Sequence, residues 1–486
     1  MPGIALRFAA LFSGVFLLFV GNGLFINSAG FELTARGVGP SLIGLINACF
    51  FLGAALSTLS AQLLISRVGH ARSYTAFASA FAAGALLHDL TANLWLWAAL
   101  RVAQGFAYYG LLMVIESWLS ERADSGNRSR MLACYEITFY VSFGLGFFLI
   151  GLGLGGFKVF LLSAVFVTLG VIPIAVTKLA EPKIPPKEKI SFPAFGGISA
   201  LALSGAMFGG LMMNGFFTMS GVFMLSQGFS AAVASKFSLF GLLGGFCVQW
   251  PAGKLSDKFG RRPALIAVTS VAVAASLSSF FYRGANPAAL NAMAFFIGFG
   301  VFSIYSLSLA RAVDESAFSE LNVVQVSRAI LFAYGVGSLL SPFVLGYAME
   351  TFGPRGFTSL YAAGSLAVWL MALRNRTVPK GFRSAYVHAP APGAALTGND
   401  DLLADPPPDA PDRMTLEESA RIAKAKSERG LGAVADNNNP PPAASPQDGS
   451  DERTAQGDAP PPGAESEGPA PEARVERDET KPDSGV

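Results

Sequence analysis

Long apolar runs constrain this chain more than any other feature of its sequence. Of its 486 residues, 52% are hydrophobic and 14% are charged, a balance that water-soluble domains of this length do not have. An α-helix needs about 20 apolar residues to cross a bilayer. The runs reach that length, so we predict an all-α membrane protein. Its twelve spanning helices are expected near residues 6–32, 42–65, 72–90, 94–120, 129–152, 158–177, 196–226, 232–252, 263–283, 287–311, 323–349 and 355–374.

Two stretches depart from this pattern. Residues 178–195 hold the charged, proline-rich run KIPPKEK, which predicts a cytoplasmic linker between two six-helix bundles, residues 1–177 and 196–376. From residue 384 onward the chain has 9 Lys and Arg against 20 Asp and Glu. Such a segment buries too little apolar surface to fold, so we predict that 377–486 is a disordered, acidic, proline-rich cytoplasmic tail. A capping box from Thr415 to Glu418 favours one short helix within it.

Basic residues predict how the helices are oriented. With a cytoplasmic N-terminus, twenty Lys and Arg fall in inside loops and five in outside loops. The positive-inside rule then places both termini in the cytoplasm. The apolar run after Arg7 is too long for a signal peptide, so we expect it to be the first spanning helix.

The two bundles resemble each other in sequence. The segment NGLFINS at 22–28 matches NGFFTMS at 214–220, and RVGH at 67–70 matches KFGR at 258–261. Two six-helix repeats of this kind are typical of secondary transporters, whose substrate site lies where the repeats meet. We therefore predict two pseudo-symmetric bundles with a site between them.

One loop has a composition suited to a tight turn at a membrane surface. It reads GKLSDKFGRRP from residue 253 to 263. Glycine permits close helix approach and unusual turn conformations, an acidic residue suits a neighbouring helix N-terminus, and basic residues hold the loop in the cytoplasm. This pattern resembles the loop signature of the major facilitator superfamily of transporters, which implies a conformational role for Gly253, Asp257, Lys258, Gly260, Arg261 and Arg262.

Arg101 is a cation in the middle of an apolar run. Its sequence context, RVAQG, resembles a second signature of the superfamily, which implies a role in proton coupling. At 100° per residue, Arg101, Gln104, Tyr108, Leu112 and Glu116 lie within about 60° of one direction. This face is expected to line a substrate cavity, because intramembrane charges need water or a partner. The alternative is that Arg101 only joins neighbouring helices.

Two carboxyl groups approach the same end of the predicted bundle. Glu116 lies near the cytoplasmic end of the fourth helix, and Glu136 lies near the start of the fifth. Carboxyl groups that share a poorly solvated region hold protons more readily, as a proton-carrying site requires. The alternative is a pair of interfacial acids that contact nearby arginines in an intracellular gate.

Further polar and aromatic residues lie near mid-membrane. Asn22, Asn27 and Asn214 are on the repeat-related first and seventh helices, where they are expected either to bind substrate or to bond helices together. Aromatic side chains are candidates for the apolar walls, namely Phe25, Tyr108, Tyr140, Phe217, Tyr305 and Tyr334.

Several motifs together resemble the YcaD-like branch of bacterial facilitators. They include IESWL at 115–119, YSLSLA at 305–310 and AYGVGS at 333–338. The loop after the second helix departs from the superfamily signature, since Gln62 and Ser66 replace its glycine and aspartate. The fifth helix also lacks the proline of drug/proton antiporters, whereas Gly337, Ser341 and Pro342 form a related pattern in the eleventh helix.

The sequence contains no phosphate-binding loop, metalloprotease motif or nucleophile elbow, so we expect neither an enzyme nor a bound cofactor or metal. Its three cysteines lie in apolar runs, which argues against disulfides and zinc. The resemblance implies a proton-coupled secondary active transporter of a small organic solute, working by alternating access as a monomer in a bacterial inner membrane. The alternatives are a passive uniporter and an interaction or sensor protein that acts through its tail. No nucleic-acid partner is expected.

Overall fold

The structure is a computed structural model that describes residues 2–122, 128–153, 157–177, 193–316, 321–380 and 383. The chain separates into two units, residues 1–429 and 430–486. All described residues belong to the first unit. The predicted tail and its Thr415–Glu418 helix therefore lie outside the described residues, as does most of the linker.

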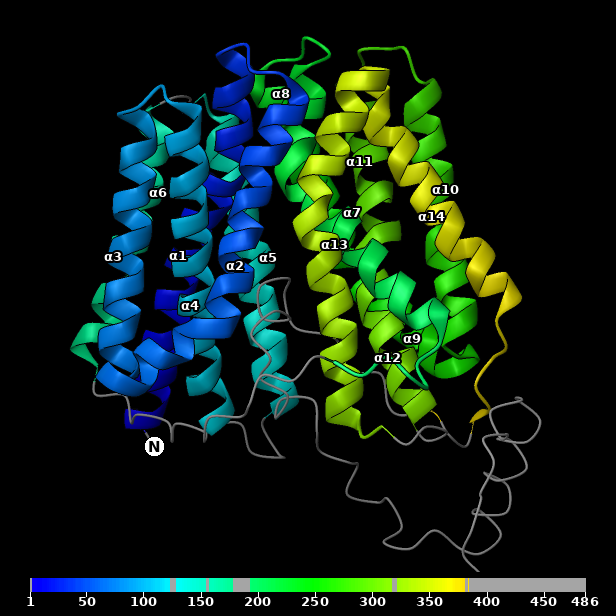
Figure 1. Cartoon of the computed structure of the whole chain (residues 1–486), viewed down its shortest axis with the longest axis horizontal. Helices are drawn as coiled ribbons and strands as arrows, with labels where there is room; N and C mark the ends of the chain where they lie inside the picture. Colours follow the sequence, from blue (N-terminus) through cyan, green and yellow to red (C-terminus); the bar gives the residue numbers. More distant parts are fainter. Residues whose placement is uncertain are drawn as a thin grey trace, which may run out of the picture. The chain divides into compact units, whose positions relative to one another are not determined.

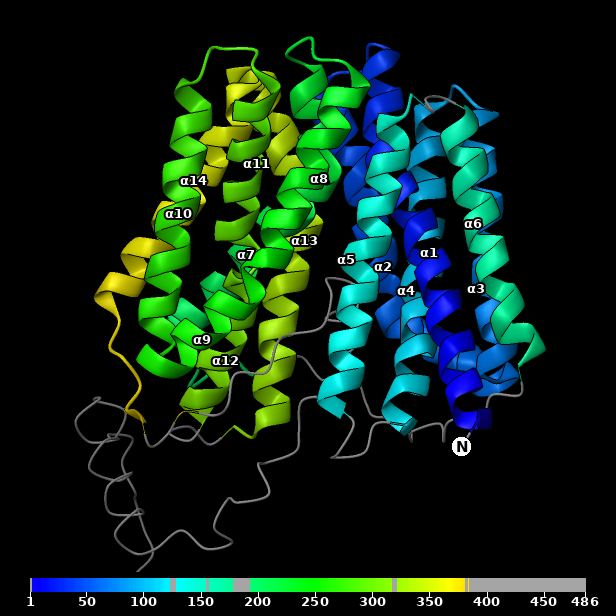
Figure 2. The same ribbon diagram turned by 180° about the vertical axis from the view of Figure 1, so that it is seen from behind.

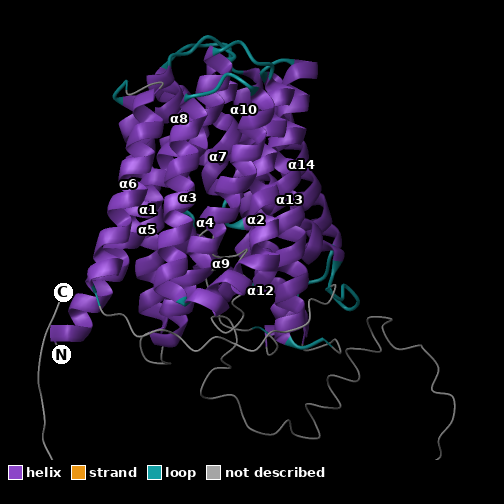
Figure 3. Ribbon diagram, turned by 60° about the vertical axis from the view of Figure 1, so that its left-hand side comes forward, coloured by secondary structure: helices purple, strands orange, loops and turns teal. Residues whose placement is uncertain are grey.

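Every regular element in the described part of the chain is a helix (Figure 3). The first half consists of six helices: α1 (Pro2–Ala35), α2 (Pro40–Val68), α3 (His70–Asp89), α4 (Leu94–Arg122), α5 (Arg128–Gly151) and α6 (Phe157–Val176). The second half consists of α7 (Ala200–Leu225), α8 (Ala231–Cys247), α9 (Gln249–Phe259), α10 (Arg261–Phe281), α11 (Pro287–Val301), α12 (Ile304–Ser316), α13 (Val323–Phe352) and α14 (Arg355–Arg374).

These segments correspond to the twelve predicted spans, two of which are interrupted. Val248 separates α8 from α9, and a short turn at Phe302–Ser303 separates α11 from α12. Eleven of the described helices, with each interrupted pair joined, are long and apolar enough to cross a membrane. The twelfth, α3, spans 20 residues but carries polar groups at both ends.

The helix pairs within the two halves repeat one pattern. In the first half α2 packs on α4 and α1 on α5, while α3 packs on α4 and α6. In the second half α8 packs on α11 and α7 on α13, while α10 packs on α11 and α14. Gly69 and Gly260 occupy matching turns with φ of 85° and 102°, which favours glycine at both places. The local backbone thus reproduces the sequence repeat.

Figures 1 and 2 show where each helix of the first unit begins and ends. We call the side where α1 begins the near side, and the opposite side, where α2 begins, the far side. The halves meet through α2 with α13, α5 with α8, and α1 with α7. Gly44 of α2 lies directly against the Pro342 carbonyl of α13, and Gly346 lies against the Pro40 carbonyl. Because Pro40 starts α2, this tight crossing lies toward the far side.

Candidate functional site

A polar cluster lies between α7 and α13 near the middle of the bundle. The Asn214 side chain donates hydrogen bonds to the Tyr334 hydroxyl (3.0 Å) and the Ser338 hydroxyl (2.8 Å). The Tyr305 ring packs against the Tyr334 ring, with centroids 4.4 Å apart. All four residues are buried. Asn214 and Tyr305, both predicted site residues, are thus brought to one place.

This cluster continues into the first half through tyrosines of α4. Tyr109 of α4 lies near Tyr334 of α13. Tyr108, next to it, lies beside the Asn22 amide of α1. Glu116 follows Tyr109 by seven residues, about two helical turns, and therefore points in nearly the same direction. Tyr109 and Glu116 thus share one face of α4.

The Glu116 carboxyl group is buried with few hydrogen bonds to offset the cost of its burial. Its side chain belongs to a residue only 1% exposed, and neither carboxyl oxygen makes a well-aligned hydrogen bond to the described residues. The Tyr135 hydroxyl of α5 lies beside it. Glu136, the predicted partner, is the next residue along α5 and is half-buried. The α5 side chain placed against Glu116 is therefore a tyrosine.

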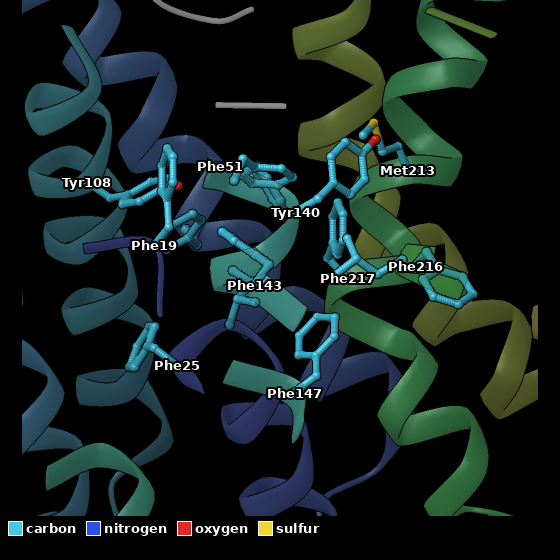
Figure 4. Close-up of a cluster of buried hydrophobic side chains, with 14 of the residues drawn as sticks. Phe19, Phe25, Phe51, Tyr108, Tyr140, Phe143, Phe147, Met213, Phe216 and Phe217 are labelled. Carbon is cyan, nitrogen blue, oxygen red and sulfur yellow. The ribbon is translucent and has the colours of Figure 1, made fainter. Parts of the chain in front are cut away.

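Phenylalanine rings join the two halves beside this cluster (Figure 4). Phe217 of α7 contacts three rings of α5, those of Phe139, Phe143 and Phe147, at centroid distances of 5.7 to 6.4 Å. Tyr140 of α5 accepts a 2.9 Å hydrogen bond from the Gln249 amide at the start of α9. Tyr140 also donates to the Gly245 carbonyl of α8 at 3.4 Å, so this aromatic interface carries polar contacts through Tyr140.

Arg101 lies apart from the polar cluster, toward the far side of the bundle. Fifteen residues separate it from Glu116, about 22 Å along α4. Its Nη2 donates to Asn47 Oδ1 of α2 at 2.9 Å, and its guanidinium lies 4.4 Å from the centre of the Phe25 ring. Asn47 Nδ2 in turn contacts the Thr218 carbonyl of α7 at 3.4 Å. Arg101 is thus linked to the second half through one amide side chain.

Two other predicted residues also lie away from the central cluster. Gln104 donates to the Phe81 carbonyl of α3 at 3.4 Å, inside the first half. Asn27 is buried without a hydrogen bond from its side chain to the described residues, and a Cβ at Gly221 of α7 would come 2.6 Å from its Oδ1. Asn27 therefore marks the crossing of α1 and α7.

The predicted loop motif forms a network within the second half at the near side. Arg261, 2% exposed, forms ion pairs with Asp257 and Asp314, both at 3.0 Å. Arg262 donates to the Ala372 and Leu373 carbonyls at the end of α14. Gly253 is buried, whereas Lys258 is exposed with its ammonium 5.2 Å from the centre of the Phe259 ring. The motif thus ties α9, α10, α12 and α14 together.

A third ion pair extends this network, between Arg311 and Glu315 of α12 at 2.8 Å. Glu315 also accepts from the Ser199 backbone N–H before α7. Asp314, Glu315, Asn47 and Tyr135 were not predicted as functional residues. Each is a polar side chain inside or at the end of an apolar run, which is the signal that could have identified them.

The described residues contain no group of three or more His, Cys, Asp and Glu placed to hold a metal ion. Hydroxyls, an amide and ring faces make up the central cluster, and the Glu116 carboxyl group lies on α4. Such groups can bind a small organic molecule and exchange a proton.

Comparisons with known proteins agree with this architecture. The chain matches the Major Facilitator Superfamily over residues 11–325. It is 27% identical over 337 residues to an uncharacterized MFS-type transporter YcaD of Salmonella arizonae, covering 68% of this chain and 86% of that protein.

Solved structures with a similar fold are also transporters. They include the nucleoside transporter NupG, with a TM-score of 0.59, 14% identity, and 76% and 98% of the two chains covered. A bacterial homolog of the human lysosomal transporter Spinster, in an inward-facing and occupied conformation, has a TM-score of 0.58 and 16% identity, with 80% and 100% covered. The chain is a multi-pass membrane protein that belongs to the Major Facilitator Superfamily.

Proposed function

We propose that this protein is a secondary active transporter that moves a small organic solute by alternating access and exchanges protons at Glu116. The observation that carries the proposal is that buried polar side chains lie on both sides of the junction: Asn214 is hydrogen-bonded to Tyr334 in the second half, and Tyr109, near Tyr334, shares one face of α4 with Glu116. A site at the junction of two repeats becomes accessible from one side or the other as the halves rock.

The distribution of contacts supports a closed gate on the far side. Ser41 N–H donates to Glu350 across the halves at 2.8 Å, and the Asn47–Thr218 contact and the Gly44–Pro342 crossing lie on the same side. The near-side ion pairs of the described residues instead stay within the second half. In this state, separation of the halves at the near side would expose the site.

Positive charge at the near-side helix ends supports placing the near side in the cytoplasm. Arg67, Lys258, Arg262 and Arg374 are at near-side helix ends, and the positive-inside rule places such ends in the cytoplasm. Both termini then face the cytoplasm of a bacterial inner membrane. In this arrangement the Asp257 loop stabilises one end state.

A ligand screen, followed by uptake assays on the hits, tests this proposal without assuming a substrate. A ligand that binds the folded protein raises its apparent stability by mass action. The purified full chain is unfolded thermally against metabolites and drugs at pH 5.5 and 7.5, and each hit is tested for uptake into vesicles with and without a pH gradient. We expect a hit whose uptake follows the gradient. Uptake indifferent to the gradient would favour the passive uniporter instead.

The tail-mediated alternative is tested in the same vesicles. A chain truncated after Arg383 should transport at the rate of the full chain. Loss of all function in a folded truncated protein would favour an interaction or sensor protein.

A further inference from the structure

The chain continues past its last helix as a short segment at the near side. After α14 ends at Arg374, the structure describes residues 375–380 and 383, which we call the strap. The strap runs on from the end of α14 along the near side (Figure 1). Val378 at its centre is only 3% exposed. Because an apolar side chain gains free energy by leaving water, burial this complete favours a strap that stays docked on the second half.

Two arginines of the second half hold the strap. Arg262 at the start of α10 donates to the Leu373 carbonyl at the end of α14 (3.0 Å) and to the Thr377 hydroxyl of the strap (3.5 Å). Arg311 of α12 donates to the Arg376 carbonyl at 3.0 Å. The last carbonyls of a helix have no partner within it, and a charged donor forms the stronger kind of hydrogen bond. The strap is therefore attached to both α10 and α12.

A third arginine belongs to the strap itself. Arg383 Nε donates to the Val378 carbonyl at 2.9 Å, which folds the strap back on itself. A Cβ at Gly260 would come 2.8 Å from Arg383 Cζ, so the guanidinium lies against the turn between α9 and α10. The strap thus also contacts the loop motif.

These contacts join helix ends that are far apart in the chain. Arg311 is paired with Glu315 at 2.8 Å and lies 3.4 Å from the Ser199 hydroxyl before α7. It therefore connects the strap to α12 and to the approach to α7, while Arg262 connects the strap to α10 and α14. Removing the strap takes one acceptor from each arginine and loosens the near-side ends of these helices.

We propose that the strap is a positioning element for transport, which keeps the near-side ends of α10, α12 and α14 together while the second half moves. This inference rests on the proposed alternating access and adds residues that act outside the ligand site. Rocking of one half as a body requires its helix ends to move together. Loss of the strap therefore slows the change between end states and leaves ligand binding intact.

Two truncations of the chain test the strap against the rest of the tail. One ends after Arg383 and keeps the strap, and the other ends after Arg374 and removes it. For a hit of the ligand screen, we expect the longer chain to match the full chain. The shorter chain should keep its KM while kcat falls about tenfold, because conformational steps set many kcat values. Both chains should show the same ligand-induced rise in Tm. A strap that only added stability would leave kcat per folded molecule unchanged.

Point variants give the same test if the shorter chain does not fold. Val378→Asp puts an unpaired charge at the buried position, which favours release of the strap, so kcat should fall as in the shorter chain. Val378→Ile keeps an apolar side chain and should retain kcat. Lys380→Gln removes an exposed charge of the same segment and is the control.

Cysteine labelling measures the docking itself, without transport. In a full chain whose native cysteines are replaced, Val378→Cys should react with a water-soluble maleimide about tenfold more slowly than Lys380→Cys, because a buried site reacts only after local opening. Arg262→Gln combined with Arg311→Gln should release the strap and make the two positions react equally fast.

A folded chain that ends at Arg374 and transports with the kcat of the full chain would overturn the inference. Equal labelling at positions 378 and 380 of the full chain with its arginines intact would do the same. Failure of the transport proposal gives a different pattern, in which the full chain moves no hit of the screen. In that case slow labelling at position 378 that the arginine variants abolish would still support a docked strap, and equal labelling would overturn it.

Discussion

The near and far sides of the bundle are held together in different ways. On the far side the contacts run between the halves, through Ser41–Glu350, Asn47–Thr218 and the Gly44–Pro342 crossing. On the near side the strong contacts among described residues run within the second half, centred on Arg261 and Arg311. The described far-side contacts therefore join the two halves, whereas the near-side ion pairs join helices of the second half alone; in the proposed mechanism the first set would break on opening and the second would move as a unit.

Among the described residues, the first half shows no ion-pair network of this kind at the repeat-related place. Gln62 and Ser66 replace the glycine and aspartate of the loop signature, and His70 stands where the second half has Arg261. The His70 and Tyr74 rings lie 6.1 Å from the Trp118 ring. The two near-side ends thus pack differently although their backbones match.

The largest expected effect comes from breaking the near-side block. Asp314→Asn removes the buried partner of Arg261, and loss of one member of a buried ion pair costs about 3–5 kcal/mol. The free energy of unfolding in detergent should fall by that amount. Asp89→Asn is the matched control, and an equal loss in both variants would contradict the role given to the pair.

Adding a methyl group at the far-side crossing should have the next largest effect on the free energy of unfolding. Gly44→Ala places a Cβ against the Pro342 carbonyl, and such overpacking costs about 1–3 kcal/mol. Because the crossing joins the halves, cysteines introduced at the far-side end should also be labelled faster. Gly196→Ala, where a Cβ would meet nothing within 4 Å, is the control. If the labelling stays unchanged, the crossing does not act as a gate.

Arg101→Ala should reduce transport while leaving stability nearly unchanged. The guanidinium is a buried cation without an acidic partner in the described structure, so its removal should change the free energy of unfolding little. Its link to Thr218 through Asn47 would be lost, and uptake of the screened solute should fall at least tenfold. Unchanged uptake would refute a role for Arg101 in transport.

The smallest effect on stability is expected for Asp257→Asn. The Asp257 side chain is 52% exposed, and exposed ion pairs contribute about 0.2–1 kcal/mol. The variant should shift the balance between end states, seen as altered cysteine accessibility, while ligand affinity is retained. Complete loss of affinity in a folded protein would contradict this expectation.

Hydrophobicity was sufficient to predict the spanning helices because each one must be apolar over a fixed length. It did not predict the interruptions at Val248 and Phe302–Ser303. Those segments are apolar, and a local break in a helix depends on packing against its neighbours.

The candidate site was predicted in part for a similar reason. Charges in apolar runs predicted that Arg101 and Glu116 lie inside the bundle, and both are buried. Helical periodicity gives the face of a residue on its own helix and not the helix that the face meets. It therefore did not show that Gln104 faces α3 or that Tyr135 lies beside Glu116.

Distances across the two sides test alternating access most directly. After replacement of the native cysteines, spin labels are placed at two repeat-related, exposed pairs: Ala92 with Ala285 on the far side, and Val68 with Phe259 on the near side. Both distances are measured at pH 5.5 and 7.5, with and without a ligand from the screen. Alternating access predicts reciprocal changes, with the far-side distance increasing as the near-side distance decreases. Distances that stay fixed in all conditions, or that increase together on both sides, would contradict it.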